Sequence, residues 1–292
     1  MAATIIDGRE IAAQVHEEVR AEVERLRRSD IEPGLAVVLV GENPASVSYV
    51  RGKTKAAAEI MRSQTIRLDA GISQEDLLAL VDDLNADPQW HGVLVQLPLP
   101  GHIDEQAVTS RVLPEKDVDG LHPVNVGKLF RGEPALRPCT PHGVVQMLMR
   151  TGHDPAGKHV VICGRSNLVG KPLAGLLMQK ARGGNATVTL CHTGTAEIAE
   201  HTRRADIVIA AMGRPGAITS DMVTEHAVVI DVGVNRVPDA TRKSGSRLVG
   251  DVAFDEVAAK ASAITPVPGG VGPMTVAMLL YNTMLAASGR QE

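Results

Sequence analysis

Apolar residues in the N-terminal part of the chain occur in two patterns, continuous runs and the roughly 3.6-residue spacing of a helix. Together these patterns predict alternating strands and helices. Residues 34–41 and 91–100 contain continuous apolar runs rich in β-branched side chains, typical of buried parallel strands. Residues 8–28 carry apolar side chains at the spacing of an amphipathic helix. The other elements predicted here are a helix over 47–61, a short strand over 64–70 and a helix over 73–87 with Ser73 as its N-cap. This alternation indicates a parallel α/β unit.

The C-terminal part repeats the alternation and predicts a second α/β unit. It begins with a strand, a glycine turn and a helix start over residues 158–172. Further apolar runs predict strands within 186–191, 205–213 and 227–235, helical segments between the first two, and a final helix over 275–288. Residues 103–152 are irregular and rich in proline. We interpret them as the crossing between two domains, including a helix over 141–150.

Composition narrows the possible functions. The 292 residues suggest two domains, and only 2% of them are aromatic, so a Tyr outside the aliphatic core needs a reason. The net charge of -4 argues against nucleic acid as the main partner. The three cysteines, Cys139, Cys163 and Cys191, form no C-x-x-C motif, which fits a reducing compartment and gives no metal site. Without a signal-peptide pattern or a membrane-length apolar run, a cytoplasmic protein with no membrane partner is expected.

The turn within residues 158–172 is a candidate phosphate-binding loop. Gly164 and Gly170 stand six residues apart, and Ser166 occupies the middle position of the G-x-G-x-x-G pattern. The pattern is therefore incomplete, although a tight turn with backbone N–H groups at a helix start still suits a dinucleotide. Pro172 agrees with a helix N-terminus there. The alternative is an ordinary strand–helix turn whose glycines serve packing.

The end of the next strand bears on which dinucleotide binds. An NAD site usually places a carboxylate there for the ribose hydroxyl. Here Cys191 is followed by His, Thr193, Gly and Thr, with no carboxylate before Glu197. A carboxylate would repel a 2′-phosphate, whereas Arg165 and Thr193 can bind one, so NADP is favoured and some use of NAD stays open. The alternative for Arg165 is a solvated surface side chain.

A Tyr and a Lys share one side of the predicted helix over residues 47–61. The apolar stripe of this helix, taken as its core face, consists of Val47, Val50, Thr54, Ala57, Ala58 and Met61. Tyr49 and Lys53 are i, i+4 neighbours on the flank of that stripe. A Lys in apolar surroundings can act as an acid or base, and the Tyr offers a ring face to a flat ligand. The alternative is an exposed Lys on an amphipathic helix.

Three further features suggest a ligand site. Gln96 is a polar residue at the carboxyl end of an apolar strand, where ligands of open α/β sheets bind. Asp117 and Asp119 lie in a turn-prone stretch and can bind N–H groups of a ligand. Residues 266–275 are rich in proline and glycine, which suggests backbone held close to a ligand.

Six stretches together make the resemblance specific. In order along the chain they are "YVRGK", "VQLPLP", "EKDVDGLHP", "CTPHG", "GRSNLVGKP" and "PVPGGVGPMT". With them the sequence resembles the bifunctional methylenetetrahydrofolate dehydrogenase/methenyltetrahydrofolate cyclohydrolase family over almost its whole length. Each stretch alone is a weak signal, whereas six in order are highly specific.

The resemblance implies a fold and an activity. It implies NADP-dependent oxidation of 5,10-methylenetetrahydrofolate, followed by hydrolysis of the methenyl product to 10-formyltetrahydrofolate in one folate pocket between two domains. An N-terminal parallel α/β catalytic domain would contain residues 1–138 and 273–292, with the C-terminal helix packing back on it. A Rossmann-type NADP-binding domain would contain residues 139–272. Members are typically homodimers.

Site residues follow from the resemblance by motif position. Lys53 is implied as the main catalytic residue of the cyclohydrolase step, with Gln96 hydrogen-bonded to it, Tyr49 stacked on the pterin and Asp119 bound to the pterin ring. The implied substrate-binding residues also include Leu97, Pro98, Pro268, Gly269 and Gly270. The implied cofactor-binding residues are Gly164, Arg165, Ser166, Thr193, Val234 and Thr275. No metal is implied.

Other interpretations remain open from the residues alone. A shikimate-type NADP-dependent dehydrogenase has a similar two-domain architecture, but it leaves "YVRGK" and "VQLPLP" unexplained. A non-catalytic dinucleotide sensor would not need a Lys and a Gln placed as Lys53 and Gln96 are. Three histidines are possible general bases, although a structural role is favoured for each: His122, His142 and His192. We expect Asp117 to cap or turn the chain.

Overall fold

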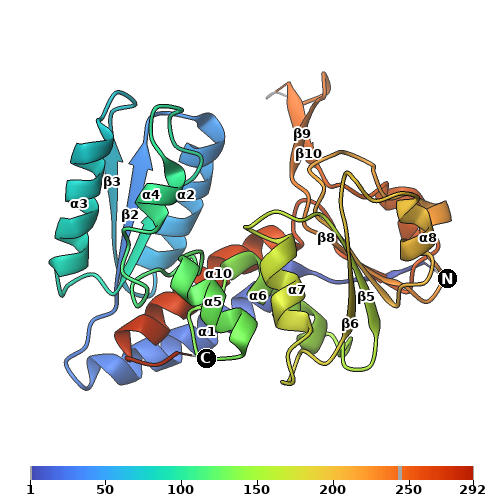
Figure 1. The fold of residues 1–292 in the computed structure, drawn as a ribbon, viewed down its shortest axis with the longest axis horizontal. Coiled ribbons are helices and arrows are strands. Elements are labelled where there is room, and N and C mark those ends of the chain that lie inside the picture. The colour runs from blue at the N-terminus through green and yellow to red at the C-terminus, as the bar shows by residue number, and fades with distance from the viewer. Residues whose placement is uncertain (1, 243–244, 292) are drawn as a thin grey trace. The chain divides into compact units, whose positions relative to one another are not determined.

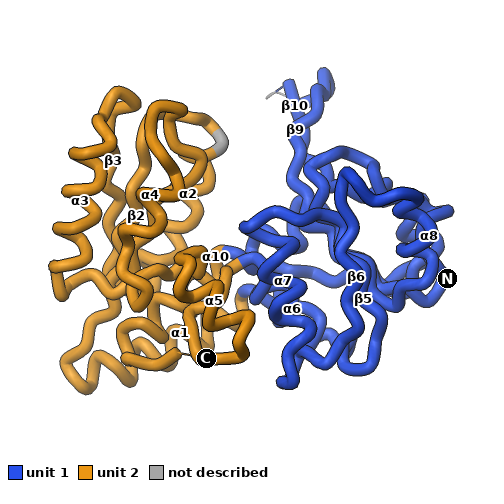
Figure 2. The backbone as a smooth tube through the Cα atoms, in the orientation of Figure 1, with its two compact units in different colours: residues 1–12, 140–275 blue, residues 13–139, 276–292 orange. Residues whose placement is uncertain are grey.

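The structure is a computed structural model that describes residues 2–242 and 245–291 (Figure 1). The chain forms two compact units, coloured in Figure 2. Unit 1 contains residues 1–12 and 140–275, and unit 2 contains residues 13–139 and 276–292. The first twelve residues thus belong to unit 1, which differs from the expected bounds, because strand β1 (Thr4–Ile5) pairs with β11 (Ala263–Ile264) of that unit.

Unit 2 is built on a parallel sheet in the order β3-β2-β4. The strands are β2 (Gly34–Val40), β3 (Arg62–Leu68) and β4 (Gly92–Val95). Every residue of β2 is buried, as its continuous apolar run predicts. Alternate β2 side chains, from Ala36 to Val40, enter a core shared with α3 (Gln74–Ala86) and α4 (Glu105–Thr109). The Ser73 hydroxyl accepts a hydrogen bond from the Asp76 N–H, which confirms the predicted N-cap.

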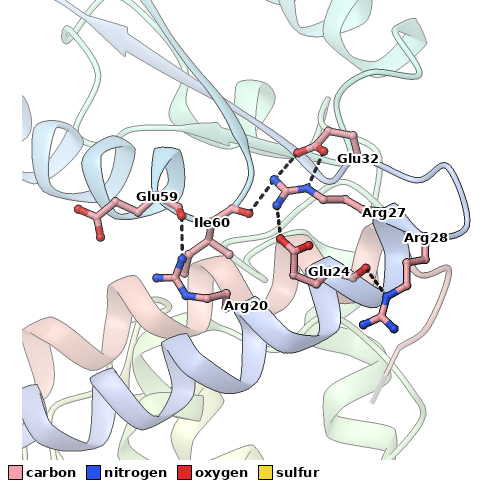
Figure 3. A network of polar contacts seen from close by, with 7 residues as sticks. All are labelled: Arg20, Glu24, Arg27, Arg28, Glu32, Glu59 and Ile60. Atoms are coloured by element: carbon pink, nitrogen blue, oxygen red, sulfur yellow. Dashed lines mark hydrogen bonds and ion pairs between the residues drawn. The ribbon is translucent and has the colours of Figure 1, made fainter.

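Helix α2 (Pro44–Ala58) carries the predicted catalytic pair and ends three residues before the predicted boundary. Two arginines of α1 (Gly8–Arg27) bind the carbonyls that follow its last turn (Figure 3). Arg20 donates to the Glu59 carbonyl at 3.0 Å, and Arg27 donates to the Ile60 carbonyl at 3.1 Å. Cations near a helix C-terminus also complement the helix dipole. The end of α2 is therefore anchored to α1.

Unit 1 contains a six-stranded parallel sheet in the order β1-β11-β8-β7-β5-β6. Its central strands include β5 (His159–Cys163), β7 (Ile207–Ala210) and β8 (Val228–Asp231), and β6 (Thr187–Cys191) forms one edge. Strand β5 pairs with β6 on one side and with β7 on the other, so the strand order reverses there. A reversal of this kind opens a ligand-binding crevice at the carboxyl ends of the strands.

A two-stranded hairpin in unit 1 was not predicted. It pairs β9 (Asn235–Pro238) with β10 (Ser246–Val249) in antiparallel register. Its residues are half-buried or exposed, and an arginine interrupts each strand, so the sequence offers no continuous apolar run. The remaining described helices are α5 (Pro123–Arg131), α6 (Cys139–Arg150), α7 (Gly170–Leu177), α8 (Ile198–Thr202), α9 (Phe254–Ala258), α10 (Val271–Ala287) and the 3-10 turn η1 (Ser220–Met222).

Helix α10 passes from unit 1 into unit 2, as the prediction of a returning C-terminal helix requires. The Asn282 amide donates to the Val118 and Arg137 carbonyls, both at 2.8 Å. Asn282 is buried within unit 2, and its two bonds tie the returning helix to the segment that leads to Asp119. Within the described residues, no helix combines the length and apolar character needed to span a membrane.

Candidate active site

In unit 2, helix α2 presents Tyr49 and Lys53 one turn apart. Lys53 is only 5% exposed, so the alternative of a solvated Lys is wrong, whereas Tyr49 is 41% exposed. Partial burial raises the pKa of the Tyr49 hydroxyl. The predicted core stripe holds at Val50 and Ala57, but Ala58 is exposed because the helix ends there and the chain turns toward β3.

Gln96 holds the amine of Lys53. The Lys53 Nζ donates to Gln96 Oε1 at 3.0 Å, and Gln96 Nε2 donates to the Leu97 carbonyl at 2.6 Å. The second bond fixes which end of the carboxamide faces the lysine. The backbone N–H of Gln96 donates to the Val38 carbonyl directly after β4, so Gln96 lies at the carboxyl end of the strand as predicted. The following Leu97–Pro98 peptide is cis.

Asp117 serves the turn rather than a ligand. It is buried and accepts hydrogen bonds from the His122 N–H at 2.7 Å and the Asn125 amide at 2.9 Å. Burial raises its pKa above the ordinary value. The His122 ring accepts the Val124 N–H as the N-cap of α5. The structural roles predicted for Asp117 and His122 are confirmed.

The charges of Asp119 and Lys53 both affect the pKa of the buried Cys139 thiol. Burial is the main cause that raises the pKa of the Cys139 thiol well above its usual value, Asp119 adds to the rise and Lys53 opposes it. The Cys139 N–H also donates to the Asp119 carbonyl at 3.3 Å. Asp119 further lines a small cavity of unit 2 together with Leu97. Cys139 and Asp119 are therefore adjacent, and the charges of Asp119 and Lys53 act on the thiol in opposite directions.

In unit 1, the turn after β5 fits a dinucleotide. Gly164 has a φ of +137°, and a Cβ there would lie 2.0 Å from the Ala211 carbonyl oxygen. A Cβ on Gly170, the first residue of α7, would lie 1.9 Å from the Gly164 oxygen. Both glycines are therefore required by close approach of backbone, as in a dinucleotide turn. Arg165 and Ser166 between them are exposed.

The chain after β6 suits a 2′-phosphate. Thr193 is exposed, and the His192 ring accepts the Gly194 N–H at 3.0 Å, which confirms a structural role for His192. No carboxylate occurs in the four residues after Cys191. The exposed donors at Arg165 and Thr193, next to the cradle at Gly164, fit NADP. The third histidine, His142, bonds Gln146 at 3.2 Å.

The other predicted residues of unit 1 lie in loops or at a helix start. Val234 is 44% exposed just after β8. The Gly269 carbonyl accepts the Gly8 N–H at 2.9 Å, and a Cβ on Gly8 would lie 1.8 Å from the Gly270 oxygen. The segment containing Pro268 is thus backed closely by the start of α1. The Thr275 hydroxyl bonds that of Thr140 at 2.9 Å.

Two features of the site were not found from the sequence. For Cys139, the sequence signal is its place in "CTPHG", one of the six stretches of the family pattern. For Asn282, the sequence signal is a side-chain amide within a mostly apolar helix. Within the described ranges, no group of three or more His, Cys, Asp or Glu residues is arranged to hold a metal ion.

Comparisons with known proteins agree with this geometry. The family model for the tetrahydrofolate dehydrogenase/cyclohydrolase catalytic domain matches residues 6–119, and that for its NAD(P)-binding domain matches residues 138–291. The bifunctional protein FolD of Bacillus pumilus is 54% identical over 288 residues, 98% of each chain. The solved structure of bifunctional FolD from Campylobacter jejuni is 46% identical with a TM-score of 0.92 and covers 99% of each chain.

A further solved structure bears on the cofactor. The FolD of Trypanosoma brucei, complexed with NADP cofactor and an inhibitor, is 42% identical with a TM-score of 0.93, and the match covers 99% of this chain and 98% of that one. Sequence, fold and local geometry agree over nearly the full length of these proteins. The chain belongs to the tetrahydrofolate dehydrogenase/cyclohydrolase family.

Proposed function

We infer that this protein oxidises 5,10-methylenetetrahydrofolate to 5,10-methenyltetrahydrofolate with NADP and then hydrolyses the methenyl group to give 10-formyltetrahydrofolate. The observation that carries the second activity is the buried Lys53 amine bonded to Gln96 at 3.0 Å. The family membership supports both steps. The first step removes a hydride from the methylene carbon, and the second adds one water and releases one proton.

We assign the proton transfers of the hydrolysis to Lys53. Water must add to the amidinium-like methenyl carbon, and the resulting adduct must lose a proton and open one carbon–nitrogen bond. An amine within hydrogen-bond reach of the adduct can accept and return these protons. Gln96 keeps the amine in place, since the Leu97 carbonyl fixes the orientation of its carboxamide.

Tyr49 and Asp119 are proposed to bind the pterin part of the substrate. The exposed Tyr49 ring offers a flat apolar surface on the same helix side as Lys53. The Asp119 carboxylate can accept N–H groups of the heterocycle. Leu97 and Pro98, directly after Gln96, are proposed to contact the substrate through the apolar end of the strand.

The oxidation needs mainly positioning. NADP, when bound, accepts the hydride from the substrate. We propose that Gly164, Arg165 and Ser166 bind its phosphates, that Thr193 binds the 2′-phosphate, and that Val234 lies along the nicotinamide. Thr275 is proposed as a further cofactor contact, and the Pro268–Gly270 segment as a substrate contact. Exposure of Arg165 and Thr193 supports their roles as phosphate ligands.

Oligomeric state and location are proposed on the resemblance alone. Because family members are typically homodimers, we propose a homodimer that works in the cytoplasm. Sedimentation equilibrium of the purified protein checks the first point. A mass equal to one chain at all concentrations would contradict it.

The proposed activity is tested by following NADPH and the methenyl product during oxidation of 5,10-methylenetetrahydrofolate. We expect NADPH to form without accumulation of methenyl product. Accumulation in step with NADPH would refute the cyclohydrolase activity, and absence of NADPH would refute the dehydrogenase. A parallel assay with NAD measures residual use of that cofactor.

Lys53→Met tests the role of the lysine. We expect the hydrolysis rate to fall more than about hundredfold, as for loss of a general acid or base, while the dehydrogenase falls less. Lys55→Met is the matched control, because Lys55 lies on the same helix but is exposed. Full hydrolysis activity in Lys53→Met would contradict the assignment.

A further inference from the structure

Two buried carboxylates lie at or just after the ends of strands in unit 1 and were not among the predicted site residues. Asp231 is the last residue of β8 and is 3% exposed, and Asp251 follows β10 and is fully buried. Burial of an ionisable group is costly unless its oxygens are well hydrogen-bonded. The partners of each carboxylate therefore indicate what the pair is built to hold.

Asp251 holds two loops. Its Oδ2 accepts the backbone N–H groups of Met212 at 2.5 Å and of Gly213 at 2.8 Å, in the loop after β7. Its Oδ1 accepts the Asn235 amide at 2.7 Å, at the start of β9. One side chain thus joins the loop after β7 to the loop after β8.

Asp231 holds the backbone around Asp251. Its Oδ1 accepts the N–H groups of Gly233 at 3.0 Å and of Asp251 at 2.9 Å, and its Oδ2 accepts the Val252 N–H at 2.9 Å. The Asp231 N–H in turn donates to the Thr265 hydroxyl at 2.7 Å. The two carboxylates therefore act as one linked unit.

Two glycines leave room for the pair. A Cβ on Gly233 would lie 2.2 Å from Asp251 Oδ1, and a Cβ on Gly250 would lie 1.8 Å from Asp231 Oδ2. Real side chains do not reach such distances, so any other residue would displace a carboxylate. The backbone is shaped around these two groups.

The loops that the pair holds are those of the proposed cofactor site. Val234 lies between Gly233, whose N–H is bound by Asp231, and Asn235, whose amide is bound by Asp251. The loop after β7 also backs the dinucleotide turn, because the Ala211 oxygen is 2.0 Å from where a Gly164 Cβ would be. Fixing these loops shapes the crevice before a ligand arrives.

Burying these two carboxylates costs free energy, and side-chain packing alone does not explain why the fold carries that cost. Among the described residues, the hydrogen bonds to the two carboxylates come from backbone N–H groups and one amide, with no cation taking part. Burial, with Asp251 adding to it, raises the pKa of Asp231 to about 6, although the three N–H donors act to lower it. Costly buried charges of this kind concentrate at functional sites.

We propose that Asp231 and Asp251 are positioning residues of the dinucleotide site, which fix the backbone at 212–213 and 233–235 in the shape that receives NADP. The proposal rests on the proposed function, since it assigns these loops to the cofactor. Neither carboxylate touches the reacting atoms. Their effect is on cofactor affinity through preorganised loops.

The test compares Asn235→Ala and Asp251→Asn with wild type. Asn235→Ala removes one donor and leaves both carboxylates, so the fold is retained, and we expect the Kd for NADP measured by calorimetry to rise about tenfold. Asp251→Asn places an NH₂ group or a single acceptor against the two loop N–H groups, and we expect a larger rise. Thr219→Ala is the matched control, since it also removes a neutral donor to a carboxylate, that of Asp221.

Two further readouts separate positioning from general damage. In the cofactor-free protein, we expect faster amide hydrogen exchange at 212–213 in Asp251→Asn and at 233–235 in both variants. Hydrolysis of added methenyltetrahydrofolate needs no cofactor, so we expect Asn235→Ala to keep it while the KM for NADP rises and kcat changes little.

The outcomes distinguish the two proposals. If wild type lacks both activities, the proposed function fails. If wild type has both and Asn235→Ala binds NADP as wild type and Thr219→Ala do, the positioning proposal is overturned. A rise in Kd with unchanged exchange at these loops would also overturn it, because affinity would then be lost by another route.

Discussion

Asp231 allows a prediction of how stability depends on pH. Asp231→Asn replaces the carboxylate by a group of the same shape that resembles its protonated form. The protonated acid and the amide both lack charge, so the variant removes the titration and keeps the volume. We therefore expect the difference in unfolding free energy between wild type and variant to change with pH.

The magnitude follows from the pKa values. The pKa of Asp231 rises from 3.8 to about 6 in the folded protein, chiefly because of burial. A pKa difference of about two corresponds to about 3 kcal/mol. Because the folded-state pKa is the higher one, this contribution is fully present below pH 3.8 and is lost as the pH rises through 6. Wild type should thus lose about 3 kcal/mol relative to Asp231→Asn across that window.

The assay is urea unfolding of both proteins at several pH values from 3.8 to above 6, with the free energies subtracted at each pH. The subtraction removes contributions from other titrating groups, such as the exposed carboxylates of Asp82 and Asp221, whose pKa values are lowered by hydrogen bonds to Arg111 and Thr219. A difference that is flat, or that grows in favour of wild type with pH, would refute the reasoning. It would mean that the three backbone N–H donors offset or outweigh the effect of burial on the pKa of Asp231.

Three further predictions concern the cofactor turn and the anchoring of α2. Gly164→Ala should abolish NADP binding in calorimetry while hydrolysis of methenyltetrahydrofolate persists, because its Cβ would lie 2.0 Å from the Ala211 oxygen; unchanged binding would contradict the close approach. Thr193→Glu should raise the KM for NADP about tenfold and change that for NAD little, since a carboxylate repels the 2′-phosphate; equal changes would argue against this position. Arg27→Met should lower the unfolding free energy in urea by about 1 kcal/mol, more than Arg25→Met, which removes an exposed arginine paired with Glu22; equal losses would contradict an anchor at α2.

Five strands were predictable because they are continuous, mainly buried apolar runs: β2, β4, β5, β7 and β8. The hairpin formed by β9 and β10 was not, since its half-exposed strands carry arginines and gain their pairing only from each other. The first strand, β1, has two residues and exists only because β11 lies beside it. Local pattern cannot report pairing between segments so far apart in the chain.

In the candidate site, too, local spacing could be predicted from the sequence, whereas contacts between distant segments could not. Helical spacing placed Tyr49 and Lys53 on one side of α2, but only the position of Gln96 on a neighbouring strand explains the burial of the lysine. The glycines of the dinucleotide turn were readable from their spacing. The partnership of Asp231 with Asp251 was not, because it depends on how three loops meet.

The discontinuous units set the order in which the protein can finish folding. Helix α2 and the sheet of unit 2 are synthesised before residues 140–275, yet Asn282, which binds the Val118 and Arg137 carbonyls, is synthesised after them. The sheet of unit 2 therefore precedes residues 140–275 of unit 1 in the chain, whereas helix α10, which completes unit 2, follows them. Until α10 is synthesised, the nascent chain exposes the apolar surface that this helix covers, so we expect the nascent chain to depend most on chaperones before α10 emerges.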